Sequence, residues 1–290
     1  MGEVLGDAMT SLAHTWRRLL IPALSLAALA SVATVVIFRL TGGHALLEVV
    51  VTSPDSLARL PDEIIDAMTR PYYQALALTA ALHLAVAVLI ALISQRIVLA
   101  HLTGSPGDAR TVWARAARRY GVGLGSTLLV WSTVVVLLGV GLSVWMNPVR
   151  SVGTPNTQSV LVASLLFLAL IAPGLWVGVA GSMTTPTAAV ESTGIVATIR
   201  RSFALVRGRW MATAGFMFLI AFLGGVSIAL IQFVALPLAA SDEASTSLTV
   251  VSALGVLTQG LLIAAVAVMC THWYLDLRVR KERLASLDLG

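Results

Sequence analysis

Side chains able to bind a metal ion or to transfer protons are few in this chain. It has five histidines and one cysteine, Cys270. No His-x-x-x-His or Glu-x-x-His pair places two metal ligands on one helix face, and a single cysteine allows neither an intramolecular disulfide nor a thiolate metal cluster. Walker A, dinucleotide-binding and Gly-x-Ser-x-Gly motifs are also missing. We therefore expect no metal site and no cofactor.

Several polar side chains lie inside strongly apolar stretches. An ionisable group in such a place is by default a functional hypothesis, and His83 lies near the middle of one stretch. Arg96 and Asp276 lie near the ends of two others, so we expect them to pair, or Arg96 to extend toward lipid phosphate. Four further polar residues are Gln95, Gln232, Gln259 and His272. Such groups either hold helices together by hydrogen bonds or line a polar cavity.

The composition is that of an integral membrane protein. Of the 290 residues, 58% are hydrophobic and 11% are charged, and the mean hydropathy is +0.90, whereas soluble domains contain about 25% charged residues. The formal charge is only +5, and the arginines lie beside apolar segments. Anionic membrane lipids are therefore the expected partners, and nucleic acid is not.

Six apolar segments are long enough to cross a bilayer core of about 30 Å. They predict an all-α integral membrane fold, a single polytopic domain over residues 1–290, with an outside loop at 39–72. The predicted spans are at about 19–38, 73–99, 121–146, 160–183, 211–236 and 248–275. Glycines at 121, 123, 125, 224 and 225 are typical of places where helices approach closely.

Three segments, at 4–18, 104–120 and 194–209, have the pattern of basic amphipathic helices on a membrane surface. In the third, Ile195, Ile199 and Phe203 share one helix face, and the arginines lie outside it. We expect contacts with lipid headgroups or with a partner protein from Arg118, Arg119, Arg200, Arg201, Arg207 and Arg209.

The distribution of basic residues predicts the orientation. Arg and Lys in short loops prefer the cytoplasm, and most of them fall on one side of the six spans. The exceptions are Arg39, Arg59, Arg70 and Arg150. This places both termini in the cytoplasm. Lys281 is the only lysine among 19 basic residues, a bias typical of GC-rich bacterial genomes, and so we expect the bacterial cytoplasmic membrane.

An internal repeat of surface helix, span, outside loop and span occurs three times. Asp7-Ala8 and Arg17-Arg18 recur at the same spacing as Asp108-Ala109 and Arg118-Arg119, and the third copy keeps the plan without the Asp-Ala pair. Either an old triplication or the shared demands of a helix entering a membrane would produce this pattern.

Two strings carry a resemblance to a known family. They are VESTGIVATIRRSFALVRGRWMATAGF, from residue 190, and WYLDLRVRKERL, from residue 273. The chain resembles the membrane domain family associated with bacterial glycerophosphoryl diester phosphodiesterases, as a stand-alone member. The matching positions are Pro186, Val190, Glu191, Ser202, Arg207, Gly208, Tyr274, Asp276, Arg278 and Arg280.

The resemblance implies a six-span fold rather than an activity. In the fused members the phosphodiesterase chemistry belongs to a separate soluble barrel. This chain has no His-Arg-Gly motif and no paired carboxylates of the kind that the barrel chemistry requires. We therefore expect no enzyme activity.

Two functions fit these observations. The first is an envelope scaffold or accessory factor that binds anionic lipid through its surface helices. The alternative is a permease-like subunit of a transporter or exporter, whose surface helices dock on an ATPase or another membrane protein. A water-accessible cavity lined by His83, Gln232 and Gln259 would favour transport, and a packed, hydrogen-bonded interior would favour the scaffold. A membrane enzyme acting on lipids fits least, because no histidine and carboxylate cluster lies on one face.

Overall fold

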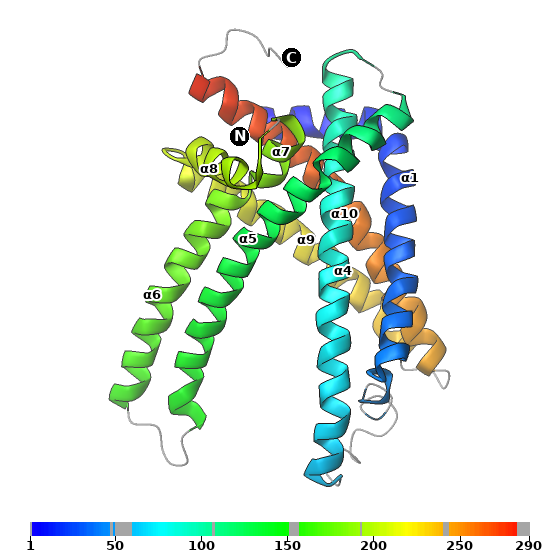
Figure 1. Cartoon of the computed structure of the whole chain (residues 1–290), viewed down its shortest axis with the longest axis vertical. Helices are drawn as coiled ribbons and strands as arrows, with labels where there is room; N and C mark the ends of the chain where they lie inside the picture. The colour runs from blue at the N-terminus through cyan, green and yellow to red at the C-terminus, as the bar shows by residue number, and fades with distance from the viewer. Residues whose placement is uncertain are drawn as a thin grey trace.

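The computed structural model describes residues 2–46, 49, 60–105, 108–150, 157–191, 193–239 and 244–282. Side chains are described for all of these except 147–150, 157, 231–232, 234–239 and 244–253. The described residues form helices and no strand (Figure 1). The helices are α1 (Gly2–Thr41), α4 (Asp62–Leu102), α5 (Ala109–Arg150), α6 (Thr157–Gly181), α7 (Thr184–Val190), α8 (Ile195–Val206), α9 (Trp210–Ala239) and α10 (Ala244–Glu282).

Six helical stretches of the described chain are long and apolar enough to cross a membrane. The predicted all-helical fold with six apolar helices of spanning length is thus confirmed. Each stretch is at least 21 residues long, and at 1.5 Å per residue about 20 residues cross the hydrocarbon core.

The predicted helix boundaries at 18/19 and 120/121 are not helix ends. Both α1 and α5 continue without a break from the basic segment into the apolar one. The first part of α1 crosses the top of the molecule and the rest descends (Figure 1). Pro22 lies inside α1, and a proline within a helix is the usual cause of such a bend, because it lacks an N–H and its ring meets the preceding turn.

The third basic segment is a separate helix. The predicted helix at 194–209 is shorter in the structure, where α8 ends at Val206 and α9 begins at Trp210. Between them Gly208 has φ of 88°, a left-handed conformation that glycine adopts at little cost and that ends a helix.

Other elements extend beyond the predicted ranges. α4 begins at Asp62, inside the segment expected to be an outside loop, and α10 continues past 275 to Glu282. The short helix α7 was not predicted. Part of the loop expected at 39–72, namely residues 47, 48 and 50–59, lies outside the described residues.

The largest buried side chains gather at the end of the molecule where α7, α8, α9 and α10 meet. Trp273 and Tyr274 of α10 pack there with Phe216 of α9 and Leu205 of α8. The rings of Phe216 and Trp273 stack with centroids 4.8 Å apart. α5 and α6 descend from this end as one pair, and α4 with the second part of α1 as another (Figure 1).

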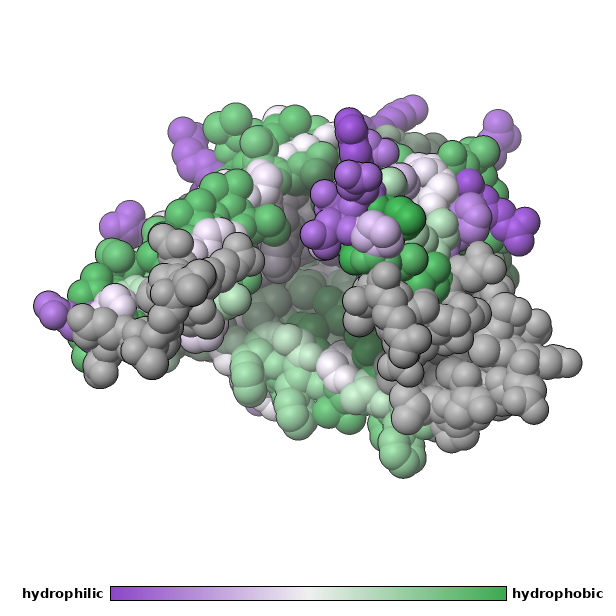
Figure 2. Space-filling view, turned by 90° about the horizontal axis from the view of Figure 1, so that it is seen from below, coloured by the Kyte–Doolittle hydropathy of each residue, from purple (hydrophilic) through white to green (hydrophobic). Residues whose placement is uncertain are grey.

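Much apolar surface faces outward along the spans. Phe218 and Phe233 of α9 are 72% and 77% exposed. Seen from below, the molecule is hollowed in the centre, and much of the coloured surface at the hollow is apolar, with a hydrophilic group at its upper rim (Figure 2). Exposing this much apolar surface to water is unfavourable, whereas lipid chains can cover it without that cost.

Small residues permit close helix contact at some of the predicted positions. A Cβ added to Gly125 would lie 2.6 Å from Cδ1 of Ile195, and one added to Gly123 would lie 3.1 Å from Leu92. At Gly121, Gly224 and Gly225 no described atom lies within 4 Å of such a Cβ. Among the described residues, these three glycines therefore make no close helix contact.

Candidate functional site

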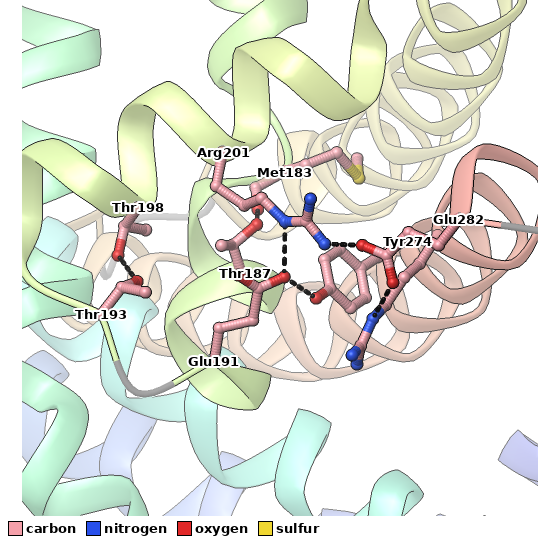
Figure 3. Close-up of polar contacts among 9 residues, drawn as sticks. Met183, Thr187, Glu191, Thr193, Thr198, Arg201, Tyr274 and Glu282 are labelled. Carbon is pink, nitrogen blue, oxygen red and sulfur yellow. Dashed lines mark hydrogen bonds and ion pairs between the residues drawn. The ribbon is translucent and has the colours of Figure 1, made fainter. Parts of the chain in front are cut away.

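A network of charged side chains joins α7, α8 and α10. Glu191 directly follows α7, with extended backbone, φ −94° and ψ 139°. Its Oε1 accepts hydrogen bonds from Nε of Arg201 and from Oη of Tyr274, both at 2.8 Å (Figure 3). One carboxylate oxygen therefore links the end of α7 to both α8 and α10.

A second carboxylate completes the network. Glu282, in the last turn of α10, forms an ion pair with Arg201 and accepts a 3.0 Å hydrogen bond from Nε of Arg278 (Figure 3). The side chains of Glu191 and Arg201 are only 17% and 30% exposed. Two carboxylates and two guanidiniums balance in charge, so this network is suited to fastening helices rather than to proton transfer.

The inner face of α8 carries small and polar residues. Thr198, Ser202 and Leu205 are buried, and Ser202 Oγ donates a 2.7 Å hydrogen bond to the carbonyl oxygen of Ala180. This face holds α8 against the end of α6. Val196, on another face of α8, is 74% exposed. This apolar side chain is therefore free to contact lipid.

We expect Ser202→Ala to lower the free energy of unfolding by about 1 kcal/mol, because it removes one buried hydrogen bond between α8 and α6. Ser227→Ala is the matched control, since Ser227 Oγ donates only to Leu223 within the same exposed turn of α9. Unfolding of the purified protein in mixed micelles, followed by tryptophan fluorescence, measures both. Equal losses for the two variants would contradict the role of Ser202.

Most of the arginines predicted to bind headgroups are exposed, and they lie at the end of the molecule that carries α8 (Figure 1). This basic end contains exposed Arg17, Arg18, Arg110, Arg115, Arg118, Arg200, Arg207 and Arg209, with Arg119 half-buried. Arg201 was expected to contact lipid headgroups or a partner protein. In the structure its guanidinium instead forms ion pairs with Glu191 and Glu282. A helical wheel assigns a residue to a face but does not identify a partner on another helix.

His83 and Gln259, two of the three residues expected to line a cavity in the transport alternative, lie near each other. His83 Nε2 is hydrogen-bonded to Thr34 Oγ1 of α1 at 3.2 Å. The cavity that His83 and Gln259 line measures only about 20 Å³, about the space of one water molecule. The predicted third member, Gln232, has its side chain outside the described residues.

The remaining polar residues of the spans lie apart from His83. His272 Nε2 is hydrogen-bonded to Ser11 Oγ at 3.0 Å, which joins α10 to the first part of α1. Gln95 is almost fully buried, and no described atom donates to its Oε1. His83 and His272 thus have different partners, and no hydrogen bond joins His83, Gln95, Gln259 and His272 to one another in the described part of the chain.

The predicted pair of Arg96 and Asp276 is not the one that forms. Asp276 Oδ1 accepts a 2.7 Å hydrogen bond from Nε of Arg280, one turn further along α10. An i,i+4 partner on the same helix is always within reach, whereas Arg96 belongs to α4. The Nε atom of Arg96 is buried, and no described atom accepts a hydrogen bond from it.

Sequence reasoning named Glu191 and Tyr274 only as positions of the resemblance and did not single out Glu282. The i,i+4 spacing of Arg278 and Glu282 is a readable signal. The partners of Glu191 are 10 and 83 residues away in the chain, and no local pattern points to them.

The apolar helices and their common basic end define a class, the multi-pass all-helical membrane proteins. Comparison of the chain with protein-family models, with curated proteins and with solved structures finds no match. Within the described residues, no three His, Cys, Asp or Glu side chains lie together in a way that would hold a metal ion.

Proposed function

We propose that this protein is a non-enzymatic scaffold or accessory factor of the bacterial cytoplasmic membrane that holds the anionic inner leaflet through three basic surface helices. These are the first parts of α1 and α5, and α8. The observation that carries the proposal is that their exposed arginines all lie at the same end of the spans. Arginines at that depth attract anionic headgroups by about 1 kcal/mol each.

The proposed orientation has the basic end and both termini in the cytoplasm. The start of α1 and the end of α10 lie at the same end of the molecule (Figure 1), as an even number of crossings requires. Arg39 and Arg70, which are also exposed, belong to the opposite end. The excess of arginine at the basic end supports this orientation by the positive-inside rule.

The three surface helices also support the proposed repeat. Each precedes a span and lies at the basic end, although only α8 is separated from its span by a turn. Triplication and the common requirements of membrane entry both account for this arrangement.

One contact supports the proposed membership of the phosphodiesterase-associated membrane domain family. The hydrogen bond from Tyr274 to Glu191 joins the two strings that carry the resemblance. If these positions hold helices together, proteins of the family can share them without sharing an activity.

The interior around His83 favours the scaffold over the permease alternative. A transport path requires a wet cavity at the level of the membrane interior, and the space beside His83 and Gln259 holds about 20 Å³. The hydrogen bond of His83 to Thr34 gives it a fastening role between α4 and α1. Recovery of an ATPase with the purified protein would support the permease instead.

Lipid analysis of the purified protein tests the proposal. We expect Arg200→Gln/Arg207→Gln to lower the enrichment of anionic over zwitterionic lipid in native nanodiscs, by about fivefold for each arginine at the headgroup level. Arg39→Gln/Arg70→Gln is the matched control, because it removes the same charge from the opposite end. Equal enrichment in the two variants would show that the basic end does not select lipid.

A further inference from the structure

Two arginines, Arg96 and Arg115, line a cavity at the basic end. The cavity measures about 360 Å³ and lies between the end of α4 and the first turns of α5. Arg96 of α4 and Arg115 of α5 line it, with Ser105 and Asp108 at the connection between the two helices. Its volume is within the range of small-molecule sites.

The arginines at this cavity form no ion pair with an acidic residue of the described chain. Arg96, Arg115 and Arg119 are close enough for their charges to repel, and none of them forms an ion pair within the described part of the chain. Asp108 is the only acidic residue that lines the cavity. A positive charge therefore remains in a partly desolvated place, and this is costly unless an anion enters.

The two arginines that line the cavity are donors that suit an oxyanion, which has several acceptor atoms. The Nε of Arg96 is buried and has no acceptor among the described residues. Guanidinium groups bind phosphate oxygens through paired N–H donors. The long helix α5 begins at Ala109, beside Asp108, so the positive end of its dipole adds to the attraction.

We propose that this cavity binds a phosphate group, with Arg96 and Arg115 as its two main ligands. The site goes beyond the proposed headgroup contacts, because the exposed Arg118, Arg200, Arg207 and Arg209 do not line it. Two sources supply such a group, the headgroup of a phosphomonoester lipid and a soluble phosphate.

An apolar cavity beside the first gives the lipid source a physical basis. It measures about 370 Å³ and is lined mainly by apolar residues, among them Ile21, Ile93, Ile97 and Trp113, together with Arg18. Ala100 and Val112 line both cavities, so the two are neighbours. A lipid held by its phosphate at Arg96 has apolar surface close by for part of an acyl chain.

Binding measurements on the full chain in non-ionic detergent test the site. The probes are short-chain phosphatidic acid, read by native mass spectrometry, and inorganic phosphate, read by calorimetry at constant ionic strength. We expect one bound probe per chain and a loss of affinity of roughly tenfold in Arg96→Gln and in Arg115→Gln, since each removes a charge-assisted hydrogen-bond donor. Arg110→Gln is the control, an exposed arginine on α5 that does not line the cavity.

Each binding result either supports or overturns the phosphate site. Binding of phosphatidic acid without inorganic phosphate supports the site and assigns it to lipid, and binding of inorganic phosphate supports the site and assigns it to soluble phosphate. Absence of one-to-one binding of either probe overturns the proposal, and so does an equal loss in Arg110→Gln. If Arg96→Gln fails to fold, the exposed Arg115 keeps the test available. Arg200→Gln/Arg207→Gln should retain this binding, so failure of the headgroup proposal is seen separately.

Discussion

Glu191→Gln is expected to lower the free energy of unfolding by about 2 kcal/mol, because one oxygen of Glu191 serves two partners. Arg201 loses one of its two carboxylates, and the buried hydroxyl of Tyr274 competes with it for the remaining amide oxygen. Breaking a fully buried charge pair costs about 3–5 kcal/mol. The expected value is smaller because Glu191 and Arg201 keep some contact with solvent.

Unfolding in mixed micelles measures this loss, and Glu63→Gln serves as its control. Glu63 is an exposed acid near the start of α4, and its replacement should change the free energy by less than about 0.5 kcal/mol. The double variant Glu191→Gln/Tyr274→Phe should cost less than the sum of the two single changes, because the residues share one hydrogen bond. Strict additivity would count against the network.

Gly260→Val is expected to cost about 2–3 kcal/mol, because α1 and α10 cross at this residue with no room for a side chain. A Cβ at Gly260 would lie 2.6 Å from the Cβ of Ala27 and 3.0 Å from the carbonyl oxygen of Ala23. Both neighbours are buried, and one of the atoms is backbone. The clash is relieved only if the two helices separate.

Gly255→Val on the same helix is the matched control for this change. A Cβ at Gly255 meets no described atom within 4 Å, and valine restricts the helix no more there than at Gly260. Thermal unfolding of the two variants in the same detergent gives the comparison. Equal destabilisation would mean that loss of glycine, rather than the crossing of α1 and α10, is responsible.

The fold was largely predictable, because the hydropathy of the sequence shows directly which segments are apolar and whether they are long enough to cross a bilayer. Six apolar runs of spanning length are visible in the sequence and recur as helices. Whether a helix ends between each surface segment and the following span was less predictable. Pro22 bends α1 without ending it, so α1 continues through Arg18-Leu19, whereas Gly208 takes a left-handed conformation and separates α8 from α9.

The site was predicted only in part, because its contacts are between helices. The helical pattern placed the exposed arginines of α8 and α5 correctly on polar faces. Of the two expectations for Arg96, the pairing with Asp276 is wrong, because Asp276 has a partner one turn away in Arg280. The link from Glu191 to Tyr274 depends on how α7 and α10 pack, and one sequence contains no local signal for that distance.

Cysteine labelling in intact cells tests the central claim, that the basic end faces the cytoplasm. Cys270 is the only cysteine and is buried, so the unaltered protein measures background. In a Cys270→Ala chain, Ala67→Cys reports the start of α4 and Ala204→Cys reports α8, both at exposed positions. We predict that a membrane-impermeant maleimide labels Ala67→Cys in intact cells, and Ala204→Cys only after the membrane is opened. Labelling of Ala204→Cys in intact cells would contradict the account.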